Sequence, residues 1–305
     1  MFVDVHGHLA PFGEKGGGPP SLRDPEGALA AKREHGVVMT IIGSPVGPGS
    51  MLPDGSAGNY RYPADQVRAH NEHMGELVDL FPDSLRAYAY LNPLGGDAML
   101  AQAADLVSDG RFVGLIVNSS IDGEFLGVPE AEDFFAMAAD LAVPVLLHPP
   151  AGPVGVQSMA HLGLVEHVVR VSDVTMGIAA IVCAGWLERF PDLRLIAACG
   201  GGGIAHLAEK LDLAMARSPG LSSPPSASLK KIFVETSCPS RAQLAANLCA
   251  FGASHILFGT DAPPLMDGVR QIVDTVSDVV GVDELHAIGW QTASDLFGLE
   301  LEAKI

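Results

Sequence analysis

The chain has 305 residues, of which 48% are hydrophobic and 18% are charged, a composition typical of a folded globular protein and not of a disordered one. Its 36 acidic and 18 basic residues give a formal net charge of -18. Because this charge repels phosphate backbones and anionic lipids, we expect no nucleic-acid partner and no membrane partner. A small anionic substrate stays compatible with it, since a few local cations can override the mean field.

The cysteines and the N-terminus bear on the cellular compartment. None of the four cysteines forms a CxxC pair, and their spacing does not resemble a disulfide framework. The N-terminus lacks the basic region of a secretory signal, and no apolar run reaches the roughly 18 residues of a membrane span. We therefore expect a cytoplasmic, soluble protein with reduced thiols.

In chain order, a strand is expected first, at residues 2–8, followed by a glycine-rich loop. Asp24, Pro25 and Glu26 then provide an N-cap, a proline in the first turn and an acid, and Gly36 ends that helix. Further strands are expected at residues 37–44, 85–92, 112–119, 144–148, 193–199, 231–236 and 255–259. Helices are expected between them at 64–80, 96–108, 131–142, 165–190 with a break near 172–173, 204–216 and 243–251, and after the last strand at 269–279 and 283–297. Long loops are expected at residues 45–63, 149–159 and 218–228.

Eight strands alternating with helices, several of them nearly continuous apolar runs, predict an α/β fold of the (β/α)8 TIM-barrel type, with residues 1–305 as a single domain. A doubly wound sheet is the main alternative. Its first strand-to-helix turn would usually carry a glycine-rich phosphate loop, whereas this chain has His6, Gly7 and His8 there.

Reactive groups in such a barrel lie where strands end. On the first strand His6 and His8 are two residues apart, so they should project to one face with Asp4 one step below them. The fifth strand ends in His148, and Asp261 follows the eighth. Imidazoles and a carboxylate with an open coordination position are typical of a catalytic site for zinc or a similar divalent ion.

Several motifs resemble the amidohydrolase superfamily, in particular the branch that contains aminocarboxymuconate-semialdehyde decarboxylase and related metal-dependent decarboxylases. They read DVHGH at residues 4–8, PVLLHP at 144–149, RFPDL at 189–193, GGG at 200–202 and FGTDAP at 258–263. The resemblance spans nearly the whole chain. It implies one divalent ion, usually Zn²⁺ and sometimes Mn²⁺, held by His6, His8, His148 and Asp261.

One position departs from that branch, in which the sixth strand ends in a histidine followed by three glycines. Here the residue is Cys199, and a thiol with a pKa near ~8.5 is a poor substitute for an imidazole base. Three interpretations stay open: Cys199 is a small apolar residue, it is a thiol that ligates metal or moves protons, or His206 in the following helix has taken over the role.

Candidate substrate-binding residues come from loops and strand ends. Arg61, in the second long loop, is the first choice as a partner for a substrate carboxylate, because guanidinium binds carboxylate in a two-pronged fork. Asn118 ends the fourth strand, where other superfamily branches place a residue that bridges two metals; since Asn cannot bridge, we predict one metal. Glu235 and Thr236 are candidates for residues behind the site.

These residues favour a metal-dependent decarboxylase that acts on a small aromatic or unsaturated carboxylic acid, with Asp261 as ligand and proton carrier. The alternative is a metal-dependent hydrolase of a carbon–nitrogen, ester or activated carbon–carbon bond, which would use water activated by the ion. A third hypothesis is a barrel that binds a ligand without turnover. We also expect a homodimer or larger homo-oligomer, with the apolar stretch at residues 178–186 as a candidate interface.

Overall fold

The computed structural model describes residues 1–10, 20–43, 62–217 and 221–301. Within them, eight parallel strands form one sheet in the order β1-β2-β3-β4-β7-β8-β9-β10. Their bounds are β1 (Phe2–His8), β2 (Val37–Gly43), β3 (Leu85–Tyr90), β4 (Phe112–Asn118), β7 (Pro144–His148), β8 (Arg194–Ala197), β9 (Phe233–Glu235) and β10 (Ile256–Leu257). The backbone N–H of Val5 donates to the carbonyl of Phe258 at 2.9 Å and joins the two ends of the sheet. The expected (β/α)8 barrel is confirmed.

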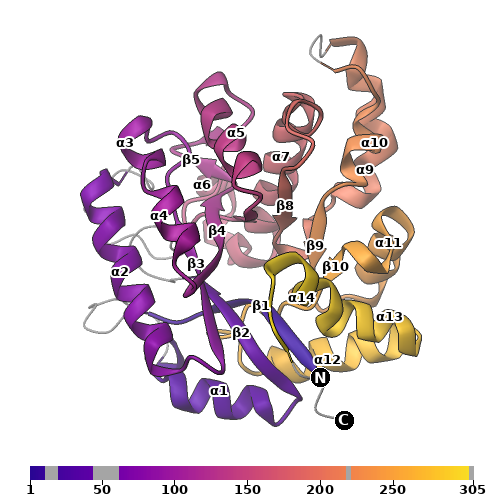
Figure 1. Ribbon diagram of the computed structural model, residues 1–305. Coiled ribbons are helices and arrows are strands. Elements are labelled where there is room, and N and C mark those ends of the chain that lie inside the picture. Colours follow the sequence, from indigo (N-terminus) through magenta and orange to yellow (C-terminus); the bar gives the residue numbers. More distant parts are fainter. Residues whose placement is uncertain (11–19, 44–61, 218–220, 302–305) are drawn as a thin grey trace.

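Helices follow the strands and surround the barrel (Figure 1). They are α1 (Pro25–Arg33), α2 (Ala64–Leu80), α3 (Asp97–Leu100), α4 (Ala103–Ser108), α5 (Glu132–Asp140), α6 (Val156–Met159), α7 (Arg170–Cys183), α8 (Trp186–Arg189), α9 (Ile204–Leu211), α10 (Pro225–Leu229), α11 (Arg241–Phe251), α12 (Gly268–Val279), α13 (Val282–His286) and α14 (Thr292–Phe297). All seven residues of β1 are buried, as expected for a strand enclosed by side chains of the barrel and by helices.

The start of α1 follows the sequence prediction. Asp24 accepts a hydrogen bond from the Gly27 N–H at 2.9 Å, and Pro25 occupies the first turn. Gly36 adopts a positive φ of 80° after the helix, a conformation that glycine reaches without steric cost. The chain is thereby turned directly into β2.

The structure also corrects several boundaries. A short hairpin, β5 (Ser120–Ile121) with β6 (Glu124–Phe125), follows β4, and α6 and α10 lie in segments expected to be loops. The long helix expected over residues 165–190 begins with a π-helical turn, Val165–Val169. The helix continues through Asp173, where a break was expected. It breaks instead at Gly185, where φ is 84°. The expected helix at 96–108 is two helices, α3 and α4.

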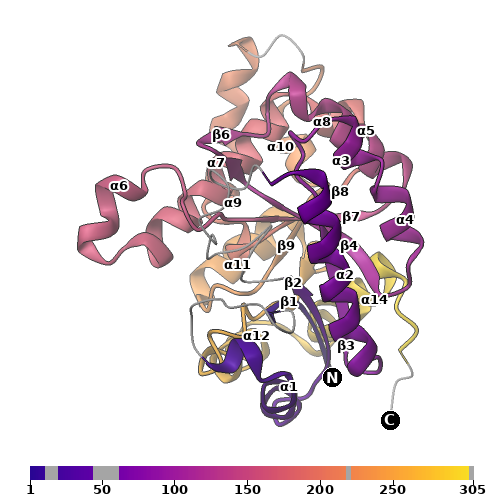
Figure 2. The ribbon, with the colours of Figure 1, turned by 90° about the vertical axis from the view of Figure 1, so that its left-hand side faces the viewer.

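The segment at residues 178–186 does not form an apolar surface, which contradicts its prediction as an interface. Ile178, Ile181 and Val182 are fully buried, and Trp186 is 6% exposed. These side chains pack into the core between α7 and the barrel. In contrast, α6 projects away from the barrel (Figure 2). No helix in the described residues has the length and apolar character needed to cross a membrane.

Candidate metal centre

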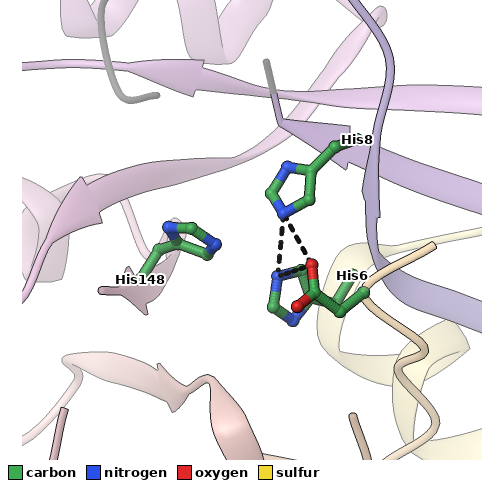
Figure 3. A group of neighbouring side chains, drawn as sticks. His6, His8 and His148 are labelled. Atoms are coloured by element: carbon green, nitrogen blue, oxygen red, sulfur yellow. Dashed lines mark hydrogen bonds and ion pairs between the residues drawn. The ribbon is translucent and has the colours of Figure 1, made fainter. Parts of the chain in front are cut away.

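Four side chains converge at the carboxyl ends of the strands (Figure 3). His6 and His8 come from β1, His148 ends β7, and Asp261 follows β10. One nitrogen or oxygen from each lies within 4.8 Å of those of the others. The Nε2 atoms of His6 and His8 are 3.2 Å apart, and Asp261 Oδ1 lies 3.0 Å from His8 Nε2. The structure thus brings together the four residues that the sequence singled out as ligands.

The chemistry of these atoms fits a divalent cation. All four residues are buried, and within the described residues neither ring nitrogen of His148 has a hydrogen-bond partner. Buried polar atoms without partners are costly unless something else satisfies them. Three imidazoles and one carboxylate are ligands for zinc or manganese, and four protein ligands leave room for water or substrate in a five-coordinate site. The arrangement is suited to a divalent metal ion.

Two residues behind the ligands fix the orientation of the imidazoles. His8 Nδ1 lies 3.2 Å from the carbonyl of Gly43 in β2, so the proton on this ring belongs on Nδ1 and the Nε2 lone pair faces the site. His6 Nδ1 lies 3.4 Å from Glu235 Oε1. Such outer partners set the tautomer of a ligating histidine and raise its basicity. Glu235 therefore acts on the centre from behind, as the sequence suggested.

Burial and nearby charges shift the pKa values of these groups. Burial lowers the pKa of His8 and, with the neighbouring histidines, holds the pKa of His148 well below its usual value. Burial also acts to lower the pKa of His6, but the carboxylates of Asp261 and Glu235 outweigh it and raise that pKa. Burial would raise the pKa of Asp261, yet His6 and His8 lower it. The shifts at His8, His148 and Asp261 favour the neutral imidazoles and the ionised carboxylate that metal binding requires, whereas His6 would release its proton when a metal binds.

Asp4, expected one step below the two histidines, supports the segments that carry the candidate ligands. The register between β1 and β2 shifts between Asp4 and Gly7, as at a β-bulge, which re-aims side chains. The Asp4 carboxylate accepts hydrogen bonds from the backbone N–H groups of His6 and Thr260, both at 3.0 Å, and from the Thr260 hydroxyl. It also pairs with the ammonium of buried Lys32 on α1 at 2.6 Å. Asp4 thus joins both ligand-bearing segments from behind.

Gly7, between the two histidines, is part of the same support. A Cβ atom there would lie 2.9 Å from Lys32 Nζ and 2.7 Å from the carbonyl oxygen of Ala262. Both distances are shorter than side-chain contacts allow. The absence of a side chain at Gly7 lets the ammonium approach the strand directly behind the ligands.

Asn118 lies beside the centre. Its Cα pairs in register with that of His148 across β4 and β7, and the residue is completely buried. Neither its side-chain oxygen nor its nitrogen has a partner in the described part of the chain. An amide in this state, next to a ligand, is available to bind a substrate oxygen or a water molecule.

Cys199 lies in the wall of a cavity of about 410 Å³ that also includes Asp261. Burial of the thiol, together with the charges of Glu235 and Asp261, raises the pKa of Cys199 well above its usual value. The thiol is therefore neutral at neutral pH, which favours the interpretation of a small uncharged wall residue. His206 is exposed on α9 and does not line this cavity. Arg61 lies outside the described residues.

A larger cavity, of about 670 Å³, lies elsewhere, among residues at the amino ends of β4, β7 and β8 such as Phe112, Pro144 and Arg194. It contains none of the four ligands. Chemistry in this fold takes place at the carboxyl ends of the strands, so the cavity beside Asp261 is the relevant one.

Arg170, at the start of α7, is only 3% exposed and was not predicted from the sequence. Its Nη1 donates to the carbonyl of Pro150, two residues after His148, at 3.1 Å. Its positive charge contributes to lowering the pKa values of His148 and Asp261. No local motif marks this arginine. Only the packing of α7 against the loop after β7 brings it close to the centre.

Fold and site together define a protein of the TIM-barrel class with a buried group of side chains suited to a metal ion. The chain belongs to the amidohydrolase family, whose profile matches residues 3–299. It is 24% identical over 222 residues to decarboxylase orsB of Emericella nidulans, a match covering 67% of this chain and 61% of that protein. It is 25% identical over 261 residues to gamma-resorcylate decarboxylase of Rhodococcus jostii, covering 77% of each.

Solved structures show the same fold. A dihydroxybenzoic acid decarboxylase from Polaromonas sp. JS666, with bound manganese and the inhibitor 2-nitroresorcinol, superposes with a TM-score of 0.81 at 18% identity. The superposition covers 99% of this chain and 98% of that one.

Proposed function

We propose that the protein is a metal-dependent decarboxylase that acts on a small aromatic or unsaturated carboxylic acid. The observation that carries the proposal is the convergence of His6, His8, His148 and Asp261, with buried atoms that have no partner within the described residues. The decarboxylase names of two relatives, at 24% and 25% identity, support this reaction over others.

One divalent ion held by these four residues would supply Lewis-acid chemistry at the substrate's oxygen atoms. We infer Zn²⁺ as the first choice from the three-imidazole ligand set, with Mn²⁺ as the alternative that the manganese-bound neighbour supports. Metal analysis of the purified protein by mass spectrometry tests this choice: about one Zn²⁺ or one Mn²⁺ per chain is expected, and fewer than about 0.1 of either would contradict it.

In the proposed reaction the bond between the ring carbon and the carboxylate breaks, carbon dioxide leaves, and a proton takes its place. Asp261 moves that proton, since its lowered pKa keeps it ionised and able to accept one before passing it on. Asn118 donates to or accepts from a substrate oxygen beside His148. Cys199 contributes a neutral wall to the substrate cavity.

The test is release of carbon dioxide from a panel of hydroxybenzoates and related acids by protein loaded with Zn²⁺ or Mn²⁺. Product formed in heavy water should contain one deuterium at the carbon that lost the carboxylate. No labelled oxygen from water should enter the organic product. A hydrolase would show the opposite pattern, with labelled oxygen in the product and no carbon dioxide. The His148→Ala variant serves as the metal-free control.

We further propose that the protein works in the cytoplasm as a homodimer or larger homo-oligomer. Light scattering during size-exclusion chromatography measures the mass in solution. A mass near that of a single 31.7 kDa chain would contradict the oligomer.

A further inference from the structure

We propose that Arg170 is the residue that selects the substrate, and that it binds a second, non-reacting anionic group on it, most simply a second carboxylate. The inference rests on the proposed function, because it concerns the acid that the same cavity would accept. Four features of the structure support it.

The first feature is the pairing of the buried cations. Among the described residues, two lysine or arginine side chains are buried, those of Lys32 and Arg170. Lys32 is fully engaged, with Asp4 at 2.6 Å and the Thr40 hydroxyl at 3.3 Å. The guanidinium of Arg170 makes one hydrogen bond, from Nη1 to Pro150, and its buried Nε has no hydrogen-bond partner. A buried guanidinium with unused donors is costly, and such a group is common where a ligand completes the set.

The second feature is the position of Glu166, which contacts both Arg170 and the cavity. Glu166 Oε1 lies 3.2 Å from Arg170 Nε, but without the alignment of a hydrogen bond. Its side chain is 47% exposed, and it lines the same cavity as Asp261 and Cys199. A half-exposed carboxylate in poor alignment is an exchangeable partner, because water can take its place at low cost.

The third feature is the geometry of the free edge. Because Nη1 is committed to Pro150, the edge formed by Nε and Nη2 is left for a carboxylate, which it binds through two parallel hydrogen bonds. The carboxylate of Glu166, a residue that lines the cavity, already lies 3.2 Å from Nε. A substrate carboxylate would displace Glu166 and make the aligned contact that Glu166 lacks.

The fourth feature is the charge of the surrounding wall. Among the described residues that line the cavity beside Asp261, none is a lysine or arginine, and the chain carries a net charge of -18. The charge of Arg170 nevertheless reaches His148, Asp261 and Cys199. Within the described residues, Arg170 is thus a buried cation that lies behind the cavity wall, in contact with the lining residue Glu166.

The chemistry of decarboxylation decides which acid group Arg170 should hold. The departing carboxylate loses its charge as carbon dioxide forms. A guanidinium bound to it would stabilise the ground state more than the transition state and slow the reaction. A group that stays anionic throughout keeps the contact in both states and contributes to binding. Arg170 therefore favours substrates that carry two anionic groups, of which one remains.

The experiment compares binding of benzoate and isophthalate, benzene-1,3-dicarboxylate, to manganese-loaded protein by calorimetry. Isophthalate should bind more tightly than benzoate. Arg170→Met should weaken isophthalate binding about 10- to 100-fold and leave benzoate binding within about twofold. Arg170→Lys should retain part of the preference, because it keeps the charge but not the fork.

Glu166→Gln is the matched control, because it removes the competing carboxylate from an exposed position without disturbing the arginine. It should strengthen isophthalate binding several-fold and leave benzoate binding unchanged. Equal effects of the Arg170→Met change on both acids, or no response of isophthalate to Glu166→Gln, would overturn the proposal. These measurements need no turnover. Failure to release carbon dioxide, with the isophthalate preference intact, would overturn the proposed reaction and leave the anion site standing.

Discussion

Substituting Lys32 by methionine should destabilise the protein and weaken its metal centre, because this lysine neutralises the carboxylate that supports both ligand-bearing segments. Lys32 and Asp4 are 1% and 0% exposed, and their charged atoms are 2.6 Å apart. Methionine has a similar length and no charge, so it fills the space of the lysine and leaves Asp4 unpaired. The remaining donors to Asp4 are two backbone N–H groups and a hydroxyl, all neutral.

The size of the effect follows from the burial of the pair. At an effective dielectric constant of about 20, two unit charges at this separation attract each other by about 6 kcal/mol. Burying both charges offsets part of that attraction, and breaking a buried pair by removing one partner costs about 3–5 kcal/mol. Because Asp4 also bonds the backbone of His6 and Thr260, its displacement shifts His6 and Asp261 relative to each other. Metal affinity should fall about 10- to 100-fold, as it does when outer partners of ligands are removed.

Urea unfolding of the metal-free protein measures the first effect, and competition with a chromophoric chelator measures the second. Lys210→Met is the matched control, since Lys210 is exposed on α9, and it should change neither quantity. Combining Lys32→Met with Asp4→Asn should recover most of the lost stability, because neither charge is then buried alone. A loss below about 1 kcal/mol for Lys32→Met would refute the reasoning.

Three further predictions concern the centre and one surface carboxylate. Glu235→Gln should lower metal affinity about 10- to 100-fold in chelator competition, because the carboxylate that faces His6 is lost; unchanged affinity would contradict the role given to Glu235. His148→Ala should abolish bound metal and carbon dioxide release together, and a cooperative thermal unfolding transition of the metal-free variant would show that the protein still folds. Glu188, hydrogen-bonded to Ser222 and Ser223, has its pKa lowered from 4.5 to about 2. It should therefore contribute up to about 1 kcal/mol above pH 4.5 that is lost as the pH falls towards 2. Acid titrations of wild type and Glu188→Gln should converge near pH 2, and parallel curves would exclude this contribution.

The alternation of strands and helices was predictable because the strands are apolar runs buried on both faces, and because local signals such as Asp24 and Gly36 mark helix ends. What local signals could not supply was the path of the segments between elements. The hairpin β5–β6 has strands of two residues each, too short for an alternating pattern. The helix break fell at Gly185 and not near Asp173, because Asp173 is held inside α7 by hydrogen bonds from Ser120 and the backbone of Val154.

The convergence of the four candidate ligands was predictable because each ends a strand or directly follows one, and strand ends meet in a barrel. The contacts of Asp4 were not predictable, because period-two alternation assumes a regular strand and the register shifts between Asp4 and Gly7. The support from Lys32 joins residues 28 positions apart through the packing of α1 on β1. No pattern along the sequence records that contact.

The two buried cations beside the centre show how a supporting residue can be distinguished from a binding one. Both come from helices outside the barrel, and both pair with a carboxylate. Lys32 contacts a carboxylate that is itself fully buried and satisfied by four donors, so an incoming ligand has nothing to replace. Arg170 contacts a carboxylate that is half exposed and misaligned, next to a cavity that reaches Asp261. The completeness of a cation's pairing, and the exposure of its partner, therefore indicate which positive charge holds the metal centre together and which one is available to a substrate.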